Sequence, residues 1–232
     1  MCAILSSIRK EASMALSEKD FSLREKKYAK TKIALANAFI ERMKTAKFSD
    51  ISIKEVCESA EVSEGTFFNY FPQKIDVVFY YQQMVSLKIS WQIRQYWETK
   101  SFKELIELIF DLIAEQIEQP YLFYEIISLF TSERKRPEGM ALTPAEKFFA
   151  HPDYAGIDEV PVQHLEEIFL TLVTEAVGKA EFKTDIKPAD AVLTLMAILI
   201  GVPLAIHIED FGGLKQYYRS QLSLLWKAIG VK

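Results

Sequence analysis

The residues between Ser63 and Pro72 have the types and spacing of a surface that recognises DNA. If they form a helix, Phe67 and Phe71, four positions apart, give it one buried stripe. The second helix of a helix-turn-helix needs an opposite face that can lie against base edges and phosphates in the major groove. Small, polar and aromatic groups occupy that face here, namely Glu64, Gly65, Thr66, Phe68, Asn69 and Tyr70.

Two short helices joined by a tight turn are predicted to position this face. Ser52 and Glu55 form a capping-box pattern, in which the serine oxygen accepts from an amide of the first turn and the glutamate reaches back. Ser63 is a second N-cap candidate, and Pro72 ends the second helix because proline disfavours helix in the residue before it. The first helix has one apolar face, made of Ile53, Val56, Cys57 and Ala60.

A basic helix is predicted directly before this unit. Residues 24–47 hold eight Lys and Arg against Glu25 and Glu41, and Ser22 with Glu25 caps the start. The whole chain carries a net charge of −4, which by itself argues against a nucleic-acid binder. Residues 1–80 nevertheless carry +2 (13 basic, 11 acidic) and residues 81–232 carry −6 (15 basic, 21 acidic). We therefore expect a local positive surface for phosphates beside the motif.

The run Gly65–Lys74 resembles the recognition-helix signature of the TetR (tetracycline-repressor-like) family of transcriptional regulators, and the amphipathic helix before it matches that family's first helix. The resemblance covers about Arg24–Tyr81. One position departs from the pattern, because Glu61 stands in the turn where the family usually has glycine. A positive φ at a residue other than glycine costs on the order of 1 kcal/mol.

The resemblance implies an all-α regulator of two domains, most often a repressor, that binds a palindromic double-stranded operator as a homodimer. Residues 22–72 would form the three-helix DNA-binding domain, and residues 73–232 the helical ligand-binding and dimerisation domain. By resemblance, Gly65 and Asn69 approach bases, while phosphates are held by Thr66, Phe68, Tyr70 and Lys74. The residues themselves add two contacts: the Ser52 N–H with a phosphate at a helix N-terminus, and Glu64 either with a cytosine amino group or with solvent.

Seven further helices are expected, and their apolar and aromatic residues point to a ligand and a partner. They span about 73–98, 101–118, 120–134, a short segment from Thr143, 161–180, 188–209 and 213–229, and residues 135–160 are the least regular part. Aromatic residues after Tyr81 are either plain core or the walls of an apolar cavity, a common place for ligand sites. Because proteins of this family bind a small effector in such a cavity, a mostly apolar effector is expected near Trp91, Gln95, Tyr124, Ile127, Ser128 and Phe169.

The apolar run from Ala191 to Ile206 is predicted to be a buried helix. It is shorter than the roughly 20 residues of a transmembrane helix, and Gly201 and Pro203 interrupt it. No membrane partner is therefore expected. The run has more apolar residues than one buried helix face of a monomer needs, so we expect a homodimer through helices 188–209 and 213–229 to bury the others.

Other classes of protein have less support. None of the three histidines has zinc-like spacing, and neither a phosphate-binding glycine loop nor a serine flanked by glycines occurs, so we predict no enzyme activity, no metal and no cofactor. Cys2 and Cys57 give no disulfide framework, and no secretory signal is visible, which fits a cytoplasmic protein. The alternative function is a helical small-molecule-binding module without DNA-binding activity; such a module should lack the basic helix and the exposed recognition face.

Overall fold

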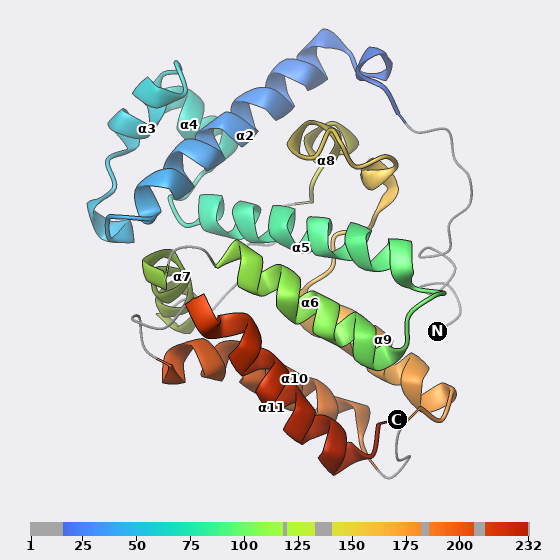
Figure 1. Ribbon diagram of the computed structural model, residues 1–232. Helices are drawn as coiled ribbons and strands as arrows, with labels where there is room; N and C mark the ends of the chain where they lie inside the picture. The colour runs from blue at the N-terminus through green and yellow to red at the C-terminus, as the bar shows by residue number, and fades with distance from the viewer. Residues whose placement is uncertain (1–15, 118–119, 133–140, 182–185, 207–211, 232) are drawn as a thin grey trace. The chain divides into compact units, whose positions relative to one another are not determined.

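The computed structural model describes residues 16–117, 120–132, 141–181, 186–206 and 212–231. In these residues the protein is all helical, as predicted, and Figure 1 shows no strand. The α-helices are α2 (Leu23–Met43), α3 (Ile53–Ser59), α4 (Glu64–Tyr70), α5 (Asp76–Tyr96), α6 (Phe102–Gln116), α7 (Pro120–Ser132), α8 (Pro144–Ala150), α9 (Leu165–Gly178), α10 (Pro188–Ala205) and α11 (Leu214–Ile229). Three short 3-10 helices join them, η1 (Glu18–Asp20), η2 (Phe48–Asp50) and η3 (Ile157–Glu159).

Local capping signals start several of these helices. Reciprocal capping boxes join Ser22 to Glu25 at α2, Ser101 to Glu104 at α6, and Thr143 to Glu146 at α8. The basic helix was expected to continue to Lys47 but ends at Met43, because the chain turns into η2 and brings the Phe48 ring 5.8 Å from the Phe39 ring. The predicted helix ends at Glu118, Arg134 and Glu209, like Cys2, lie outside the described residues.

The chain forms two compact units, and each has its own core. Unit 1 comprises Met1–Trp91 and Tyr121–Val162, and unit 2 comprises Gln92–Pro120 and Gln163–Lys232. This structural division differs from the functional division that we expected at residue 72, because α7, α8 and η3 belong to the same compact unit as the helix-turn-helix. The core of unit 1 packs α2, α3, α4 and α5 around residues that include Leu35, Phe39, Val56, Phe67, Phe71 and Tyr80.

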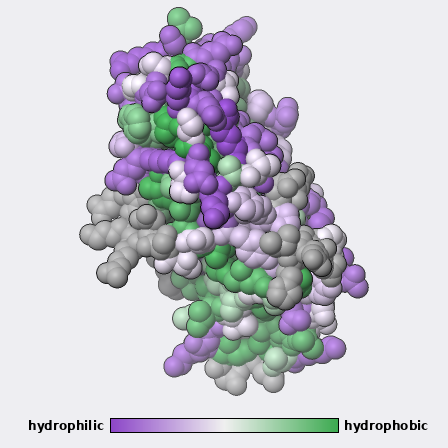
Figure 2. All heavy atoms as spheres, turned by 90° about the vertical axis from the view of Figure 1, so that its left-hand side faces the viewer, coloured by the Kyte–Doolittle hydropathy of each residue, from purple (hydrophilic) through white to green (hydrophobic). Residues whose placement is uncertain are grey.

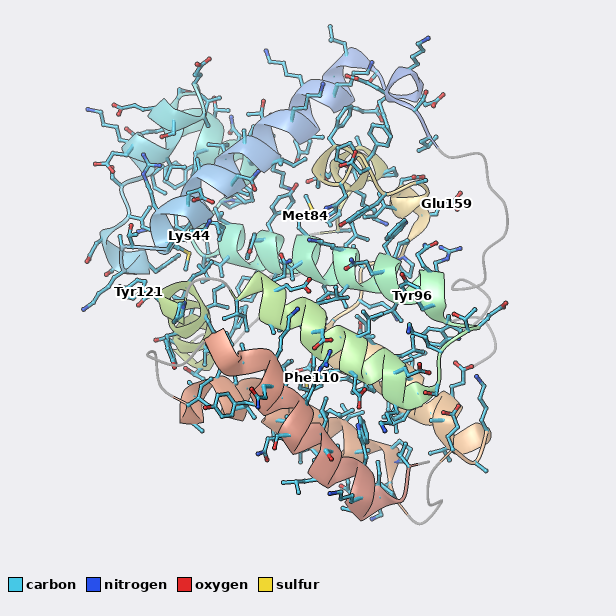
Figure 3. All side chains as sticks on the ribbon, in the orientation of Figure 1. Lys44, Met84, Tyr96, Phe110, Tyr121 and Glu159 are labelled. Carbon is cyan, nitrogen blue, oxygen red and sulfur yellow. The ribbon has the colours of Figure 1, made fainter. Side chains whose placement is uncertain are left out.

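In unit 2, helices α6, α9, α10 and α11 pack around an aromatic centre. Phe110, labelled in Figure 3, stacks on Phe169 with ring centroids 6.0 Å apart and meets the Tyr218 ring edge-on at 4.9 Å. Pro203 lies inside α10, so the carbonyl of Leu199, four residues earlier, has no amide partner in the helix. The Tyr218 hydroxyl on α11 donates to this carbonyl at 2.8 Å.

Helix α10 is less buried than its composition predicted. It is the one described helix long and apolar enough to cross a membrane, by length and composition alone, and 22% of that window is buried. The buried residues form a single stripe at four-residue spacing, Ala191, Leu195, Leu199 and Pro203. Leu193 is 69% exposed and Leu204 is 44% exposed. The prediction of a buried helix therefore holds for one face of α10 within this chain.

Candidate nucleic-acid interface

An N-cap serine begins each of the two helices of the helix-turn-helix. The Ser52 hydroxyl accepts from the Glu55 N–H at 3.4 Å, and the Ser63 hydroxyl accepts from the Thr66 N–H at 3.2 Å. The predicted return contact from Glu55 to Ser52 is replaced, because the Glu55 carboxylate lies 3.6 Å from Arg42 Nε on α2. Glu55 therefore ties α3 to α2 rather than completing a capping box.

The turn between α3 and α4 is a Schellman motif with glutamate at its left-handed position. Glu61 has a φ of 54°, as the departure from the family pattern implied. The Val62 N–H donates to the Cys57 carbonyl at 3.0 Å, and the Glu61 N–H donates to the Glu58 carbonyl at 3.3 Å. These two bonds satisfy the last carbonyls of α3, and they hold Glu61 in a conformation that glycine adopts at less cost.

Helix α4 buries one face and leaves the predicted recognition face open. Phe67 and Phe71 are fully buried, with ring centroids 5.7 Å apart. Phe68 is 48% exposed, and the Tyr70 ring lies 4.8 Å from the Tyr28 ring of α2. Hydrophilic side chains cover most of the upper part of the face seen in Figure 2, which holds α3 and α4. The remaining exposed residues of α4 are Glu64, Gly65 and Asn69.

Nothing within the chain requires glycine at position 65, because neither its backbone conformation nor its neighbours would exclude a side chain. It lies inside α4, and a Cβ at this position would meet only the Ser63 hydroxyl, at an ordinary 3.9 Å. Glycine in a helix costs roughly 0.5–1 kcal/mol relative to alanine. A residue that costs stability without an internal reason fits a position where another molecule approaches the backbone.

Lys74 lies beside η2. Its Nζ donates to the Ser49 carbonyl at 3.1 Å and lies 4.8 Å from the centre of the Phe48 ring. Partial burial lowers the pKa of Lys74, and the nearby Asp50 carboxylate opposes that shift. The side chain remains partly exposed, so its ammonium group has remaining donors at the edge of the motif.

The positive surface of α2 is smaller than the count of basic residues implied. Lys32 is not available to phosphates, because it is only 7% exposed. The Ser52–Lys74 segment itself holds two lysines and four glutamates. Arg24, Lys27 and Lys47 remain exposed. Four of the eight basic residues pair with carboxylates of this chain: Lys30 with Glu18, Lys32 with Glu146, Arg42 with Glu55, and Lys44 with Glu41.

The six candidate effector residues occupy different surroundings. Trp91 stacks on Tyr154 with centroids 4.5 Å apart, and its Nε1–H donates to the Ala155 carbonyl at 2.9 Å. Ser128 and Gln95 are exposed. Tyr124 and Ile127 are partly buried on α7 of unit 1, whereas Phe169 is fully buried in the core of unit 2.

Sequence analysis missed the importance of Lys32 and Glu146. Lys32 falls three positions after Ala29 and four before Ala36, on the inner stripe of α2, so its spacing indicated burial. Glu146 was visible only as the N3 residue of a capping box. Among the residues that the structure describes, no group of three or more His, Cys, Asp or Glu side chains could hold a metal ion.

No protein-family model matches the chain, and no curated protein matches its sequence. Solved structures do match its fold. A TetR-family regulator from Rhodococcus sp. has a TM-score of 0.59 at 12% identity, over 86% of this chain and 98% of that one. Thermus thermophilus FadR, a TetR-family repressor in complex with lauroyl-CoA, has a TM-score of 0.58 at 19% identity, over 87% of this chain and 96% of that one. The fatty acid degradation regulator FadR from Bacillus halodurans has a TM-score of 0.55 at 17% identity, over 84% of this chain and 94% of that one.

Proposed function

We propose that this protein, which has the fold of the TetR-family transcriptional regulators, binds a palindromic duplex operator through α3 and α4 and acts as a repressor. The observation that supports this most is the exposed face of α4 on a helix-turn-helix whose other face is closed by Phe67 and Phe71. An open second helix of this kind fits the major groove. In the proposed complex Gly65, Asn69 and Glu64 lie near bases, and phosphates are met by Ser52, Thr66, Phe68, Tyr70 and Lys74.

Selection of genomic fragments by the purified protein at moderate salt tests this function. The wild type should enrich a palindromic sequence, whose bound fraction falls steeply as salt rises. Binding without preference among fragments, or no binding, would overturn the proposal and favour the alternative of a ligand-binding module without DNA activity. The feature that favours this alternative is the set of four glutamates in the Ser52–Lys74 segment, because their negative charges repel phosphates.

Two variants separate the proposed phosphate and base contacts. Lys74→Met keeps an unbranched side chain of similar length beside η2 and removes the charge, so it should weaken binding to all sequences and reduce the salt slope by about one. Asn69→Ala should relax the preference at one base pair by about 1–3 kcal/mol. Equal losses at every sequence from Asn69→Ala would contradict its role in base recognition.

We also propose that a small, mostly apolar effector binds beside α5 and α7 of unit 1 and releases the DNA. Among the described residues, four buried polar atoms of α5 have no hydrogen-bond partner, and two of them are Gln83 Oε1 and Ser90 Oγ. These two atoms lie on the stripe of α5 that includes Phe79, whose ring is 5.4 Å from Phe130 of α7. Since buried polar groups in native proteins are nearly always paired, a ligand or ordered water would supply their partners. Tyr124 and Ile127 of α7 are the earlier candidates that best fit this place.

A thermal-shift screen followed by DNA titration tests the effector. Lauroyl-CoA is a suitable first probe because its acyl chain is apolar and because it is bound to the similar FadR of T. thermophilus. An effector should raise the melting temperature and weaken operator binding by about 5–150-fold. Gln83→Leu should abolish both effects of a hit that uses this amide, whereas Gln82→Leu, at the preceding position of α5, should leave them unchanged. A compound that stabilises the protein without changing operator affinity would contradict the release mechanism.

A further inference from the structure

Helix α8 packs against α2 through an ion pair that is almost completely buried. Lys32 Nζ lies 2.8 Å from Glu146 Oε1, and the two side chains are 8% and 1% exposed. Both helices belong to unit 1, and Figure 1 shows α8 lying beside α2. Removing two charges from water is costly, and losing one partner of such a pair is worse still. The contact between α2 and α8 is therefore specific to this partner and this geometry.

The pair is held in place from the α8 side. The second carboxylate oxygen of Glu146 accepts the Thr143 N–H at 2.8 Å, which closes the capping box of α8. The neighbouring Lys147 donates to the Val160 carbonyl at 2.6 Å and the Asp158 carbonyl at 3.2 Å, and so ties α8 to η3. The carboxylate that meets Lys32 therefore has little freedom to move.

A second contact fixes α8 at the other end of its inner face. The Phe21 ring, just before α2, lies 5.3 Å from the Phe148 ring and 5.7 Å from the Phe149 ring. Lys30 Nζ lies 4.7 Å from the centre of the Phe149 ring. Together with the ion pair, these rings attach α8 to the N-terminal half of α2.

On the α2 side, aromatic rings connect Lys32 to the recognition helix. Its Nζ lies 4.5 Å from the Tyr80 ring centre and 5.7 Å from those of Tyr28 and Phe71. Tyr28 packs on Tyr70 at 4.8 Å, and Tyr70 is the last residue of α4. Phe71 follows it and packs on Phe67 at 5.7 Å. The rings around the Lys32 ammonium are thus the same rings that hold the end of α4.

We propose that α8 is a working part of the DNA-binding unit, and that Glu146 is a positioning residue that sets the orientation of α4 through Lys32. The inference rests on the proposed function, because it assigns a support to the recognition helix of that function. It also identifies a point of regulation. Any ligand or partner that lifts α8 away would remove the counter-charge that holds Lys32 in place, and the rings around Lys32 would no longer fix Tyr70 and Phe71.

The decisive variant is Glu146→Gln, measured against the wild type in operator titrations at a temperature where both are folded. Glutamine keeps the capping box and removes one negative charge. If only overall charge mattered, this loss would strengthen DNA binding. The proposal expects the opposite sign, a weakening by about fivefold or more. The matched control is Glu159→Gln on η3, an exposed glutamate (Figure 3), which should bind as the wild type does or slightly tighter.

Hydrogen exchange separates positioning from general loss of stability. In Glu146→Gln the amides of residues 64–71 should exchange faster, while those of unit 2 remain protected as in the wild type. The double variant Lys32→Met/Glu146→Gln carries no unpaired buried charge, so its thermal stability should recover above that of Glu146→Gln. Its operator affinity should stay low, because the directed link between α8 and α2 is absent.

Each outcome decides the proposal. Unchanged or tighter operator binding by Glu146→Gln overturns it, and so does full recovery of affinity in the double variant. If Glu146→Gln does not fold, the double variant alone gives the answer. A wild type that binds no operator refutes the proposed function instead, which keeps the two failures distinct.

Discussion

Glu61 carries the clearest backbone strain near the interface. Its φ of 54° places a non-glycine residue in the left-handed region. Replacement by glycine removes a penalty of about 1–2 kcal/mol but increases the freedom of the unfolded chain by about 0.4–1 kcal/mol. We therefore expect Glu61→Gly to raise the free energy of unfolding by roughly 0.5–1 kcal/mol. Chemical denaturation measures this, and Ala180→Gly, at a φ of 52° after α9, should behave alike. A loss of stability in both variants would contradict the strain argument.

Gly65 should separate stability from DNA binding. Because a Cβ at this position meets nothing closer than 3.9 Å, Gly65→Ala should stabilise α4 by up to about 1 kcal/mol. In the proposed complex, the same methyl group would occupy the space through which the α4 backbone approaches a base. We expect thermal melting at a higher temperature together with weaker operator binding in titrations. Unchanged operator affinity would show that DNA does not approach Gly65 closely.

Among the helices of unit 2, the contact between α10 and α11 depends on a proline. The Tyr218 hydroxyl donates to the Leu199 carbonyl, which Pro203 leaves without an amide donor. Tyr218→Phe should cost about 1–3 kcal/mol because a buried carbonyl is left unpaired. In a Pro203→Ala background the new amide can bond the same carbonyl, so the cost should be smaller. A double-mutant cycle by denaturant unfolding measures the difference, and equal costs in both backgrounds would refute this pairing.

The segment around α8 and η3 should lose stability in acid through His151. Burial, the largest cause, lowers the pKa of His151 below its ordinary 6.5, with Lys88 adding to the shift and the bond to the Met84 carbonyl opposing it. The folded state therefore disfavours protonation, so its stability is fully present above pH 6.5 and is lost as the pH falls through the folded pKa. Between about pH 7.5 and 5.5 the melting temperature of the wild type should fall more than that of His151→Gln. If the melting temperatures of the two proteins fell in parallel with pH, the role of His151 would be contradicted.

For the whole molecule, the exposed apolar residues of the last two helices support the proposed homodimer. Leu193 is 69% exposed on α10 and Leu224 is 58% exposed on α11. Leu195 and Leu199 of α10 are only 1% and 6% exposed within the chain, so changing them would test the core of the chain and not the dimer. A second copy that covers the exposed leucines would bury apolar surface at about 25 cal/mol per Å².

The dimer prediction is tested by Leu193→Asp. A charge at a buried interface is costly, so this variant should sediment as a folded monomer at micromolar concentration while the wild type sediments as a dimer. Leu170→Asp on α9, where the leucine is 47% exposed, is the matched control and should remain dimeric. A monomeric wild type, or a dimeric Leu193→Asp, would refute an interface at this face.

Sequence alone determined the features that depend on residues a few positions apart. Ser22, Ser63, Ser101 and Thr143 begin their helices because the amides that they cap lie within one turn of them. The Phe67–Phe71 spacing likewise fixes which face of α4 is buried, and the turn at Glu61 is forced to a positive φ by the two helices that flank it. The all-helical structure of the described residues and the exposed face of α4 follow from these local rules.

Only the tertiary structure decided which polar groups are used internally. In the sequence, nothing identifies Glu146 of α8 as the partner of Lys32, one of eight basic residues in the segment 24–47. Likewise, the donor to the Leu199 carbonyl is the hydroxyl of Tyr218, which lies on a different helix. A charge or carbonyl removed from water must find a partner wherever the fold provides one. That partner can come from any part of the chain. Residue types and periods of three or four therefore predict that Lys32 faces inward, but only packing decides that α8 supplies its counter-charge.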